Sequence, residues 1–198
     1  MIVLASSSPY RRELLARLGL PFRVFSPEID ETARADETPP MLAERLALEK
    51  ALAGRAAPAA QADKAVVIGS DQVATLDGRT PIGKPGTHER ALAQLRAASG
   101  RAMVFHTAVC VLDVQGRPHS RRVDTHVRFR VLDDESIERY LRLEKPYDCA
   151  GAAKSEGLGI RLLSALEGPD PTALIGLPLI ALCSLLEEVG VDPLAPQD

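Results

Sequence analysis

The sequence feature that most constrains the fold is a short apolar run of β-branched type, Ala65-Val66-Val67-Ile68. An apolar run of this length is typical of a central strand that is buried on both faces. Such a strand requires a layer of helices on each side of its sheet. The polar segment Gly69-Ser70-Asp71-Gln72 follows directly. The run therefore predicts a sheet between helices, with the central strand ending at this polar segment.

The second half of the chain predicts neighbouring antiparallel strands. Residues 102–112 form a long apolar run. In residues 123–131, side chains expected to face inward alternate with polar ones, and Val131 is the last of the inward set. Strict alternation is typical of a strand with one buried face. Helix and strand signals elsewhere place strands at 2–5 and 22–25, helices at 9–18, 38–53, 87–100, 134–143 and 178–189, and a loop at 54–63. Together these elements predict a mixed α/β sheet flanked by helices.

The composition fits a single globular domain over residues 1–198. The chain is 45% hydrophobic and 26% charged, and its net charge of −3 argues against a broad surface for nucleic acids or membranes. The three cysteines form no C-x-x-C pair, so neither a disulfide framework nor a zinc ribbon is expected. The N-terminus lacks a basic flank, and no apolar run reaches membrane-spanning length. We expect a soluble, cytoplasmic protein without nucleic-acid or membrane partners.

The first candidate for chemistry is the segment Ser6-Ser7-Ser8-Pro9-Tyr10-Arg11-Arg12, which joins the first strand to the first helix. Free backbone amides at a helix N-terminus attract anions, and neighbouring hydroxyl and guanidinium groups add directional donors. The segment can therefore form a phosphate cradle without a glycine-rich loop. The structural alternative is an ordinary Ser8 cap followed by surface arginines.

Asp71 is the second candidate. A carboxylate directly after a buried strand lies where open α/β sheets usually bind their ligands, and there it can hold Mg²⁺ or activate a water molecule. The alternative is a turn aspartate that caps its own backbone.

The predicted helix 38–53 places charged residues beside its apolar side. Its apolar arc is formed by Leu42, Leu46, Leu48 and Leu52. Arg45 and Glu49 project into this arc, and Lys50 lies at its edge. Inward charges are costly unless they are paired or functional. An Arg45–Glu49 pair and a Lys50 side chain that reaches out to solvent are the structural alternatives.

Two weaker signals complete the set. Gly83-Lys84-Pro85 places a lysine on a stiff loop that suits a phosphate, and Glu31 belongs to an acidic cluster with Glu28 and Asp30 that can join Asp71 on a metal. Whether Glu28 or Asp30 assists Glu31 stays open. The histidines lack metal-ligand spacing; we expect His126 on the polar face of its strand and His88, His106 and His119 at the surface. No cysteine has a visible activating partner.

Taken together, the segments resemble one family, the Maf-like nucleotide pyrophosphatases. The segments that carry the resemblance occur in family order and are Leu4–Leu15, Arg45–Ala51, Gly69–Gln72, Gly83–Pro85, Ala150–Ala152 and Gly176–Pro178. The resemblance implies a two-lobed fold like that of the inosine triphosphate pyrophosphatases, with a deep cleft. It also implies hydrolysis of a nucleoside triphosphate to monophosphate and pyrophosphate, a divalent metal (Mg²⁺, with Mn²⁺ as the alternative) and frequently a homodimer.

The resemblance also assigns roles residue by residue. The positions that match the family's active site are Ser6, Arg11, Glu31, Lys50, Asp71 and Lys84. Asp71 matches the proposed proton acceptor. Arg11, Lys50 and Lys84 can neutralise a triphosphate, while Glu31 and Asp71 can hold the metal or direct the attacking water.

Three further positions bear on the choice of substrate. The branch that cleaves dTTP and UTP has Arg, Thr and Gln where this chain has Tyr10, Gln72 and Glu156, and the 7-methyl-GTP branch has an aromatic residue, Gln and Glu. A methylated guanine is cationic, so stacking on Tyr10 would add a cation–π interaction. Glu156 could accept hydrogen bonds from the guanine edge. The aromatic residue of that branch is typically Trp, so Tyr10 departs from the pattern. A dTTP/UTP pyrophosphatase and a non-catalytic nucleotide-binding regulator of cell division are the alternatives.

Overall fold

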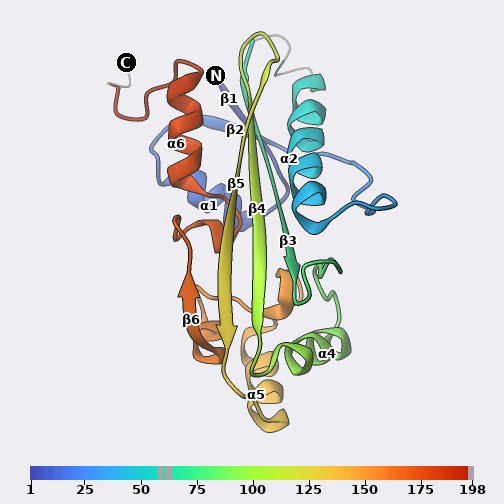
Figure 1. The fold of residues 1–198 in the computed structure, drawn as a ribbon. Coiled ribbons are helices and arrows are strands. Elements are labelled where there is room, and N and C mark those ends of the chain that lie inside the picture. Colours follow the sequence, from blue (N-terminus) through green and yellow to red (C-terminus); the bar gives the residue numbers. More distant parts are fainter. Residues whose placement is uncertain (58–59, 61–63, 196–198) are drawn as a thin grey trace.

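The computed structural model describes residues 1–57, 60 and 64–195 and contains one mixed sheet with the strand order β2-β1-β3-β4-β5-β6 (Figure 1). The strands are β1 Ile2–Ala5, β2 Phe22–Phe25, β3 Val66–Thr75, β4 Ala102–Leu112, β5 Pro118–Phe129 and β6 Leu163–Glu167. The helices are α1 Pro9–Ala16, α2 Pro39–Ala56, α4 His88–Ala98, α5 Asp134–Glu144 and α6 Leu179–Glu188, with 3-10 turns η1 Ala150–Ala152, η2 Leu158–Leu162 and η3 Ala173–Ile175. The predicted mixed α/β sheet flanked by helices is confirmed.

The sheet changes character along β3. β1 runs parallel to both β2 and β3, but it pairs only with the first part of β3, ending at Ala5 opposite Gly69. Beyond Gly69, β3 continues beside antiparallel β4 as far as Thr75. β5 and β6 extend the antiparallel part. One long strand therefore connects a parallel region with an antiparallel one.

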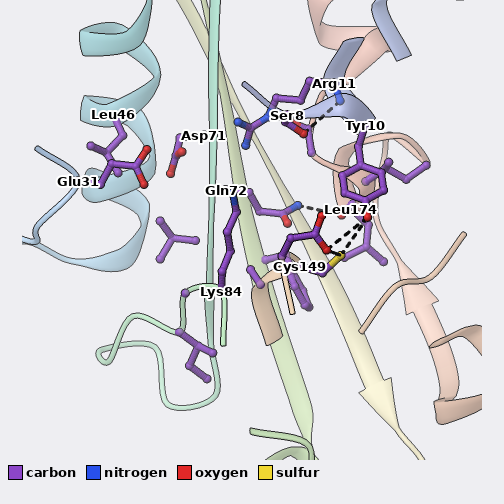
Figure 2. A pocket seen from close by; sticks show the side chains of 18 of the residues that line it. Ser8, Tyr10, Arg11, Glu31, Leu46, Asp71, Gln72, Lys84, Cys149 and Leu174 are labelled. Carbon is purple, nitrogen blue, oxygen red and sulfur yellow. Dashed lines mark hydrogen bonds between the residues drawn. The ribbon is translucent and has the colours of Figure 1, made fainter. Parts of the chain in front are cut away.

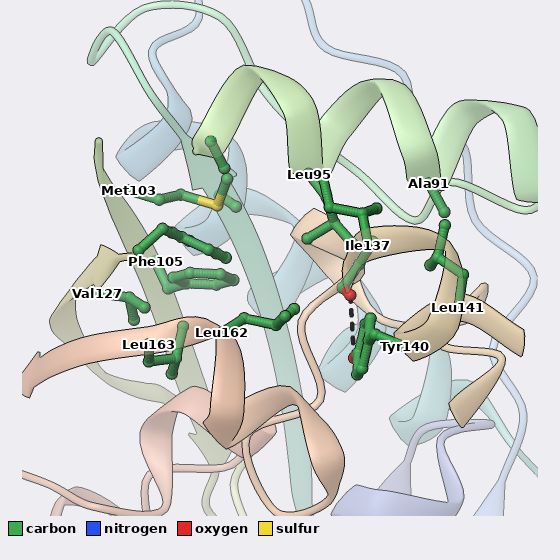
Figure 3. Close-up of a cluster of buried hydrophobic side chains, with 14 of the residues drawn as sticks. Ala91, Leu95, Met103, Phe105, Val127, Ile137, Tyr140, Leu141, Leu162 and Leu163 are labelled. Carbon is green, nitrogen blue, oxygen red and sulfur yellow. Dashed lines mark hydrogen bonds between the residues drawn. The ribbon is translucent and has the colours of Figure 1, made fainter. Parts of the chain in front are cut away.

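Two lobes form around the two ends of the long strands. In Figure 1 the first lobe contains β1, β2, α1, α2 and α6, and the second contains α4, α5 and β6. In the first lobe α2 covers one face of the sheet through Leu46 and Val67, while α1 and α6 cover the other through Leu15 and Ile68. The second lobe has its own core, in which Phe105 packs among residues of α4, α5 and η2 (Figure 3).

Glycine allows α2 to lie unusually close to the sheet. A Cβ atom on Gly69 would collide with the carbonyl oxygen of Ala47 and lie 2.6 Å from the amide nitrogen of Ala51. One on Gly54 would lie 2.7 Å from Cβ of Ala5. Real side chains do not approach so closely, so both positions require glycine for this packing. These contacts fix how closely α2 lies against β3.

The structure corrects the predicted end of the central strand. Asp71 does not follow the strand but lies inside β3, opposite Ala108 of β4. The polar residues fit there because Asp71 bonds to Lys50 and Ser70 donates to the carbonyl oxygen of Ala108 at 2.7 Å. Asp71 nevertheless lies just beyond the carboxyl end of β1, at the edge of the parallel region.

Several other boundaries also differ from the prediction. Val131 lies outside β5 and is 89% exposed, so the alternation ends at Phe129. β6 is an additional strand that the sequence pattern did not predict. The predicted loop 54–63 begins too early, because α2 continues to Ala56; its residues 58–59 and 61–63 lie outside the described part of the chain. Among the described residues, no helix is long and apolar enough to span a membrane.

The buried side of α2 is also different from the predicted arc. Leu52 is 48% exposed, whereas Lys50 is only 7% exposed and shares its face with Leu46 and Ala47. Lys50 therefore does not reach out to solvent. The predicted Arg45–Glu49 pair is confirmed at 2.9 Å. His106 was expected at the surface but is buried on β4, with Nδ1 2.8 Å from a carboxylate oxygen of Asp124.

Candidate active site

A cleft of about 450 Å³ opens between the two lobes, where β3 passes from one to the other (Figure 2). This volume lies in the range of small-molecule binding sites. The predicted site residues on its wall are Tyr10, Arg11, Glu31, Lys50, Asp71, Gln72, Lys84 and Glu156. The structure therefore brings together the three cationic and two acidic side chains, which come from five separate segments of the chain.

Lys50 joins the two carboxylates of the site. Its ammonium nitrogen lies 2.6 Å from Oδ1 of Asp71 and 2.7 Å from Oε1 of Glu31. Lys50 and Asp71 are each 7% exposed. Burying two charges is costly unless they are paired, and this pair forms where α2 packs closely over Gly69. The packing of the first lobe thus places a lysine and a carboxylate against each other in the cleft.

Glu31 reaches the same point from the loop between β2 and α2. Its side chain is 60% exposed, so solvent reaches this side of the acidic pair. Burial tends to raise the pKa of Glu31, but the hydrogen bond and charge of Lys50, with the charges of Lys84 and Arg11, lower it overall. Glu31 is therefore an ionised carboxylate that feels all three cations.

The neighbouring acidic residues Glu28 and Asp30 are not among the described residues that line the cleft. Asp30 instead accepts a hydrogen bond from the backbone nitrogen of Thr32 at 2.9 Å. This bond shapes the turn that presents Glu31. Of the acidic cluster, Glu31 alone faces the cleft.

Arg11 lies in the first turn of α1, which begins as the sequence predicts. Ser8 is the N-cap, and its hydroxyl accepts from the backbone nitrogen of Arg11. The Nε of Arg11 donates to the carbonyl oxygen of Gly176 at 2.7 Å, and the same oxygen accepts from Ser70 at 3.0 Å. One edge of the guanidinium is therefore fixed to the protein. The rest of the group points into the cleft (Figure 2).

Lys84 comes from the loop that follows β3. The chain turns at Asp77-Gly78, and Ile82 then bridges back to Ala74 of β3. This returns the next residues toward the cleft, where Lys84 lines the wall as an exposed side chain. Lys84 can thus approach a ligand from the side opposite to Arg11 (Figure 2).

Ser6 is placed differently from the other predicted catalytic residues. It is buried and does not belong to the described wall of the cleft. Its hydroxyl accepts from the backbone nitrogen of Ser8 at 3.1 Å. Ser6 therefore shapes the turn between β1 and α1, and Ser8 is the serine that lines the cleft.

The other end of the cleft carries the predicted specificity residues. The side-chain nitrogen of Gln72 donates to Thr107 Oγ1 and to the carbonyl oxygens of Ala173 and Leu174 at 2.9–3.0 Å. These bonds hold the amide in one orientation, so its oxygen is the atom that Gln72 can offer to a ligand. Glu156 is exposed on the wall.

Tyr10 lies beside two residues that the sequence did not mark as site residues, Asp148 and Cys149. The hydroxyl of Tyr10 donates to Asp148 at 3.4 Å, and Lys154 Nζ lies 5.5 Å from the ring centroid. Burial and the charge of Asp148 raise the pKa of the Cys149 thiol to about 12, so this cysteine is not a thiolate nucleophile. Because Asp148 lies outside the segments that carry the resemblance, only the folded structure reveals its position on the wall.

The acidic pair fits a metal that completes its coordination with substrate. Among the described residues, no group of three or more His, Cys, Asp or Glu side chains is arranged to hold a metal ion. Glu31 and Asp71 nevertheless meet at Lys50. Mg²⁺ is often bound by one or two carboxylates, with phosphate oxygens and water as its other ligands. The donor set therefore suits Mg²⁺ together with a nucleotide.

Comparison with known proteins gives relatives over almost the whole chain. The chain is 58% identical over 191 residues to a Polaromonas sp. protein named 7-methyl-GTP pyrophosphatase, covering 96% of this chain and 85% of that protein. Proteins of the same name from Burkholderia pseudomallei and Ralstonia nicotianae are 59% and 57% identical, covering 96% and 95% of this chain and 87% and 95% of their own lengths.

Among solved structures, the chain is similar to a nucleoside-triphosphatase / dITP/XTP pyrophosphatase from Mycobacterium abscessus, with 19% identity and a TM-score of 0.42. The likeness covers 66% of this chain and 74% of that one. The family model described as "Maf-like protein" matches residues 1–189 of this chain. With that match and relatives above 50% identity over nearly its full length, the chain belongs to the family of Maf-like proteins.

Proposed function

We propose that this protein is a nucleoside triphosphate pyrophosphatase that hydrolyses 7-methyl-GTP, or a closely related modified nucleotide, to the monophosphate and pyrophosphate. The observation that carries the proposal is the meeting of Arg11, Lys50 and Lys84 with Glu31 and Asp71 in one cleft. The names of the three relatives above agree with it.

The cationic side chains bind the triphosphate. Arg11 and Lys84 approach the cleft from α1 and from the loop after β3, so they can contact the chain of phosphates from two sides. Lys50 adds a third positive charge at the acidic pair. Fixed cations stabilise charge that develops on phosphate oxygens in the transition state, and this is the main contribution of proteins to phosphoryl transfer.

Asp71 accepts a proton from the attacking water. The water oxygen bonds to the α-phosphorus, the bond between that phosphorus and the α–β bridging oxygen breaks, and pyrophosphate leaves with the electron pair. Asp71 faces the cleft from a strand, and Lys50 fixes its carboxylate at 2.6 Å, so its position is well defined. A general base must lie within hydrogen-bond reach of the water that it activates, which a rigid carboxylate on the wall satisfies.

Glu31 and Asp71 would hold the divalent metal that the reaction requires, with Mg²⁺ as the expected ion and Mn²⁺ as the alternative. The ion supplies charge neutralisation at the phosphates and lowers the pKa of bound water. Because Lys50 contacts both carboxylates, its ammonium competes with the ion for them. Substrate phosphates offer Lys50 a new partner, so metal and nucleotide should bind more tightly together than alone.

The nucleobase of the substrate is recognised at the other end of the cleft. 7-Methylguanine is cationic, and the ring of Tyr10 already lies within cation–π range of one cation, Lys154. Glu156 and Asp148 add two exposed carboxylates on the same wall. An acidic end favours a cationic base over a neutral pyrimidine. Glu156 and the oxygen of Gln72 can accept hydrogen bonds from the guanine edge.

A nucleotide panel tests the proposal. The purified protein is incubated with Mg²⁺ and 7-methyl-GTP, GTP, dTTP or UTP, and both pyrophosphate and the monophosphate are measured. We expect 7-methyl-GTP to have the highest kcat/KM, and Asp71→Asn to slow the release of pyrophosphate strongly. Faster cleavage of UTP or dTTP would contradict the substrate but retain the reaction. If no nucleotide is cleaved, the enzyme proposal fails and a nucleotide-binding regulator becomes the better interpretation.

The homodimer implied by the resemblance and the cytoplasmic location stay predictions. Sedimentation equilibrium of the full chain, with and without nucleotide, tests the first. Fractionation of the producing cells tests the second.

A further inference from the structure

Glu31 lies on a segment without helix or strand. Residues 26–38 join β2 to α2, and within them Glu31 has a side chain that is 60% exposed. A loop with so little burial is expected to sample several conformations unless other groups hold it. Yet Glu31 must meet Lys50 on α2 at 2.7 Å. The structure therefore needs an anchor between this loop and α2.

Arg45 provides the contacts of such an anchor. Its Nε and Nη2 donate to the two carboxylate oxygens of Glu37 at 2.6 and 2.9 Å. Nη2 also donates to the carbonyl oxygen of Thr32, directly after Glu31, at 3.0 Å, and Nη1 bonds to Glu49 at 2.9 Å. One side chain thus ties both ends of the segment 32–37 to α2.

The anchor is partly buried and geometrically specific. The side chains of Arg45 and Glu37 are 12% and 7% exposed. A planar guanidinium can form two parallel bonds to a carboxylate and still reach a carbonyl oxygen, whereas a lysine ammonium cannot reproduce that fork. The same bond lowers the pKa of Glu37 to about 2, so this carboxylate stays charged throughout the physiological range.

We propose that Arg45 is a positioning residue that holds the 26–38 loop in the place where Glu31 meets Lys50 in the cleft. Arg45 does not touch the substrate; it acts through Glu31. The importance of Glu31 to the reaction rests on the function proposed above. The anchoring of the loop is independent of that function, because it concerns only contacts within the protein.

The variant Arg45→Met tests the anchor, and Arg96→Met is its matched control. Arg96 also forms a two-bond pair with a carboxylate, that of Asp134, at 2.8 Å, but in the second lobe. Hydrogen exchange of peptides covering residues 28–37 is compared among wild type and both variants, together with their melting temperatures. We expect faster exchange of these peptides in Arg45→Met only. Unchanged exchange in that variant would overturn the proposal.

A double-mutant cycle then tests whether Arg45 acts through Glu31. We expect Arg45→Met to lower kcat about 10- to 100-fold on the substrate that the panel identifies, since a misplacement of about 1 Å can cost that much. In a Glu31→Gln background the same substitution should change kcat by less than about two- to three-fold, because residues in one network are not additive. Equal losses in both backgrounds would indicate a general structural role and contradict the proposal.

Glu37→Gln supplies a second way to weaken the anchor if Arg45→Met folds poorly. It keeps the shape of the side chain and removes the charge that Arg45 binds. The same exchange pattern and the same non-additivity with Glu31→Gln are expected. If wild type cleaves no nucleotide, the proposed function fails, while the hydrogen-exchange comparison still decides whether Arg45 holds the loop.

Discussion

At the end of the cleft beside α2, Lys50 and Asp71 are 7% exposed and joined at 2.6 Å, whereas at the end beside η1 Asp148 and Glu156 are exposed. The first end is built from the packed face of a helix, the centre of a strand and a tethered loop. The second is built from short turns and the edge of α1. The comparison indicates that Lys50 and Asp71, which are expected to take part in the reaction, are held rigidly, while the exposed carboxylates expected to recognise the nucleobase are less constrained.

This difference has a physical cause. A buried charge pair persists only if the surrounding packing fixes both partners, so its geometry cannot drift without a large cost in free energy. Exposed carboxylates are screened and can move with their turns. Substitutions at the α2 end should therefore affect kcat strongly, and those at the η1 end should change the preference among nucleotides.

The largest effect is expected for Asp71→Asn. The amide keeps the shape but cannot accept the proton from water, so kcat should fall by about 10²- to 10⁴-fold. Because Asp71 is also expected to hold the metal, nucleotide binding is compared by calorimetry without added metal, where it should change much less. If the variant retains kcat within a few-fold of wild type, Asp71 at the buried end of the cleft is not the general base.

Gly69→Ala is expected to have the next largest effect. The new Cβ would press on the backbone of Ala47 and Ala51, so α2 must move outward and carry Lys50 away from Asp71. We expect a loss of about 1–3 kcal/mol in unfolding free energy from overpacking and up to about 10²-fold in kcat from misplacement.

Gly54→Ala is the matched control for that prediction, because its new Cβ would press the same helix against Ala5 of β1 instead of against β3 at Gly69. It should lower the free energy of unfolding by a similar amount with a smaller loss of kcat. Urea unfolding and steady-state kinetics on both variants provide the comparison. Equal losses of kcat would mean that activity follows stability alone, and the special role of the Lys50 contact would be refuted.

A smaller and selective effect is expected for Glu156→Gln. Removing one carboxylate weakens recognition of the guanine edge and of the positive ring, so kcat/KM for 7-methyl-GTP should fall about 5- to 100-fold, which corresponds to about 1–3 kcal/mol. The value for UTP should fall little or rise. The ratio of the two kcat/KM values measures this effect, and a uniform decrease for both nucleotides would contradict a role in selectivity.

The smallest effect concerns the pH dependence of stability. Glu37 has its pKa lowered from 4.5 to about 2 by the hydrogen bond from Arg45, so its stabilising contribution is fully present above about pH 4.5 and is lost as the pH falls toward 2. The Tm difference between wild type and Glu37→Gln should therefore be larger at pH 7 than at pH 3. An equal Tm difference at both pH values would contradict the view that the Glu37 carboxylate stabilises the anchor in its ionised form.

Much of the fold could be predicted from local pattern. The Ser8 cap, the apolar β1 and the antiparallel strands after residue 102 each have a signal within a few residues. Convergence of Arg11, Lys50, Lys84, Glu31 and Asp71 was expected from ordered motifs and is confirmed by the cleft. Their roles in the reaction stay predictions. The extension of β3 through Asp71 was missed because the polar residues there are satisfied by partners distant in sequence.

The sequence by itself determined which chemical groups this protein has and in what order they occur, because strand, cap and motif signals depend on neighbours along the chain. Only the tertiary structure decided which groups meet: Lys50 turns inward because Gly69 admits α2, Glu31 reaches Lys50 beside a loop that Arg45 ties to α2, and Ser6 lies behind the wall that Ser8 forms. Such contacts join residues far apart in sequence, and their geometry follows from packing, which no local pattern contains.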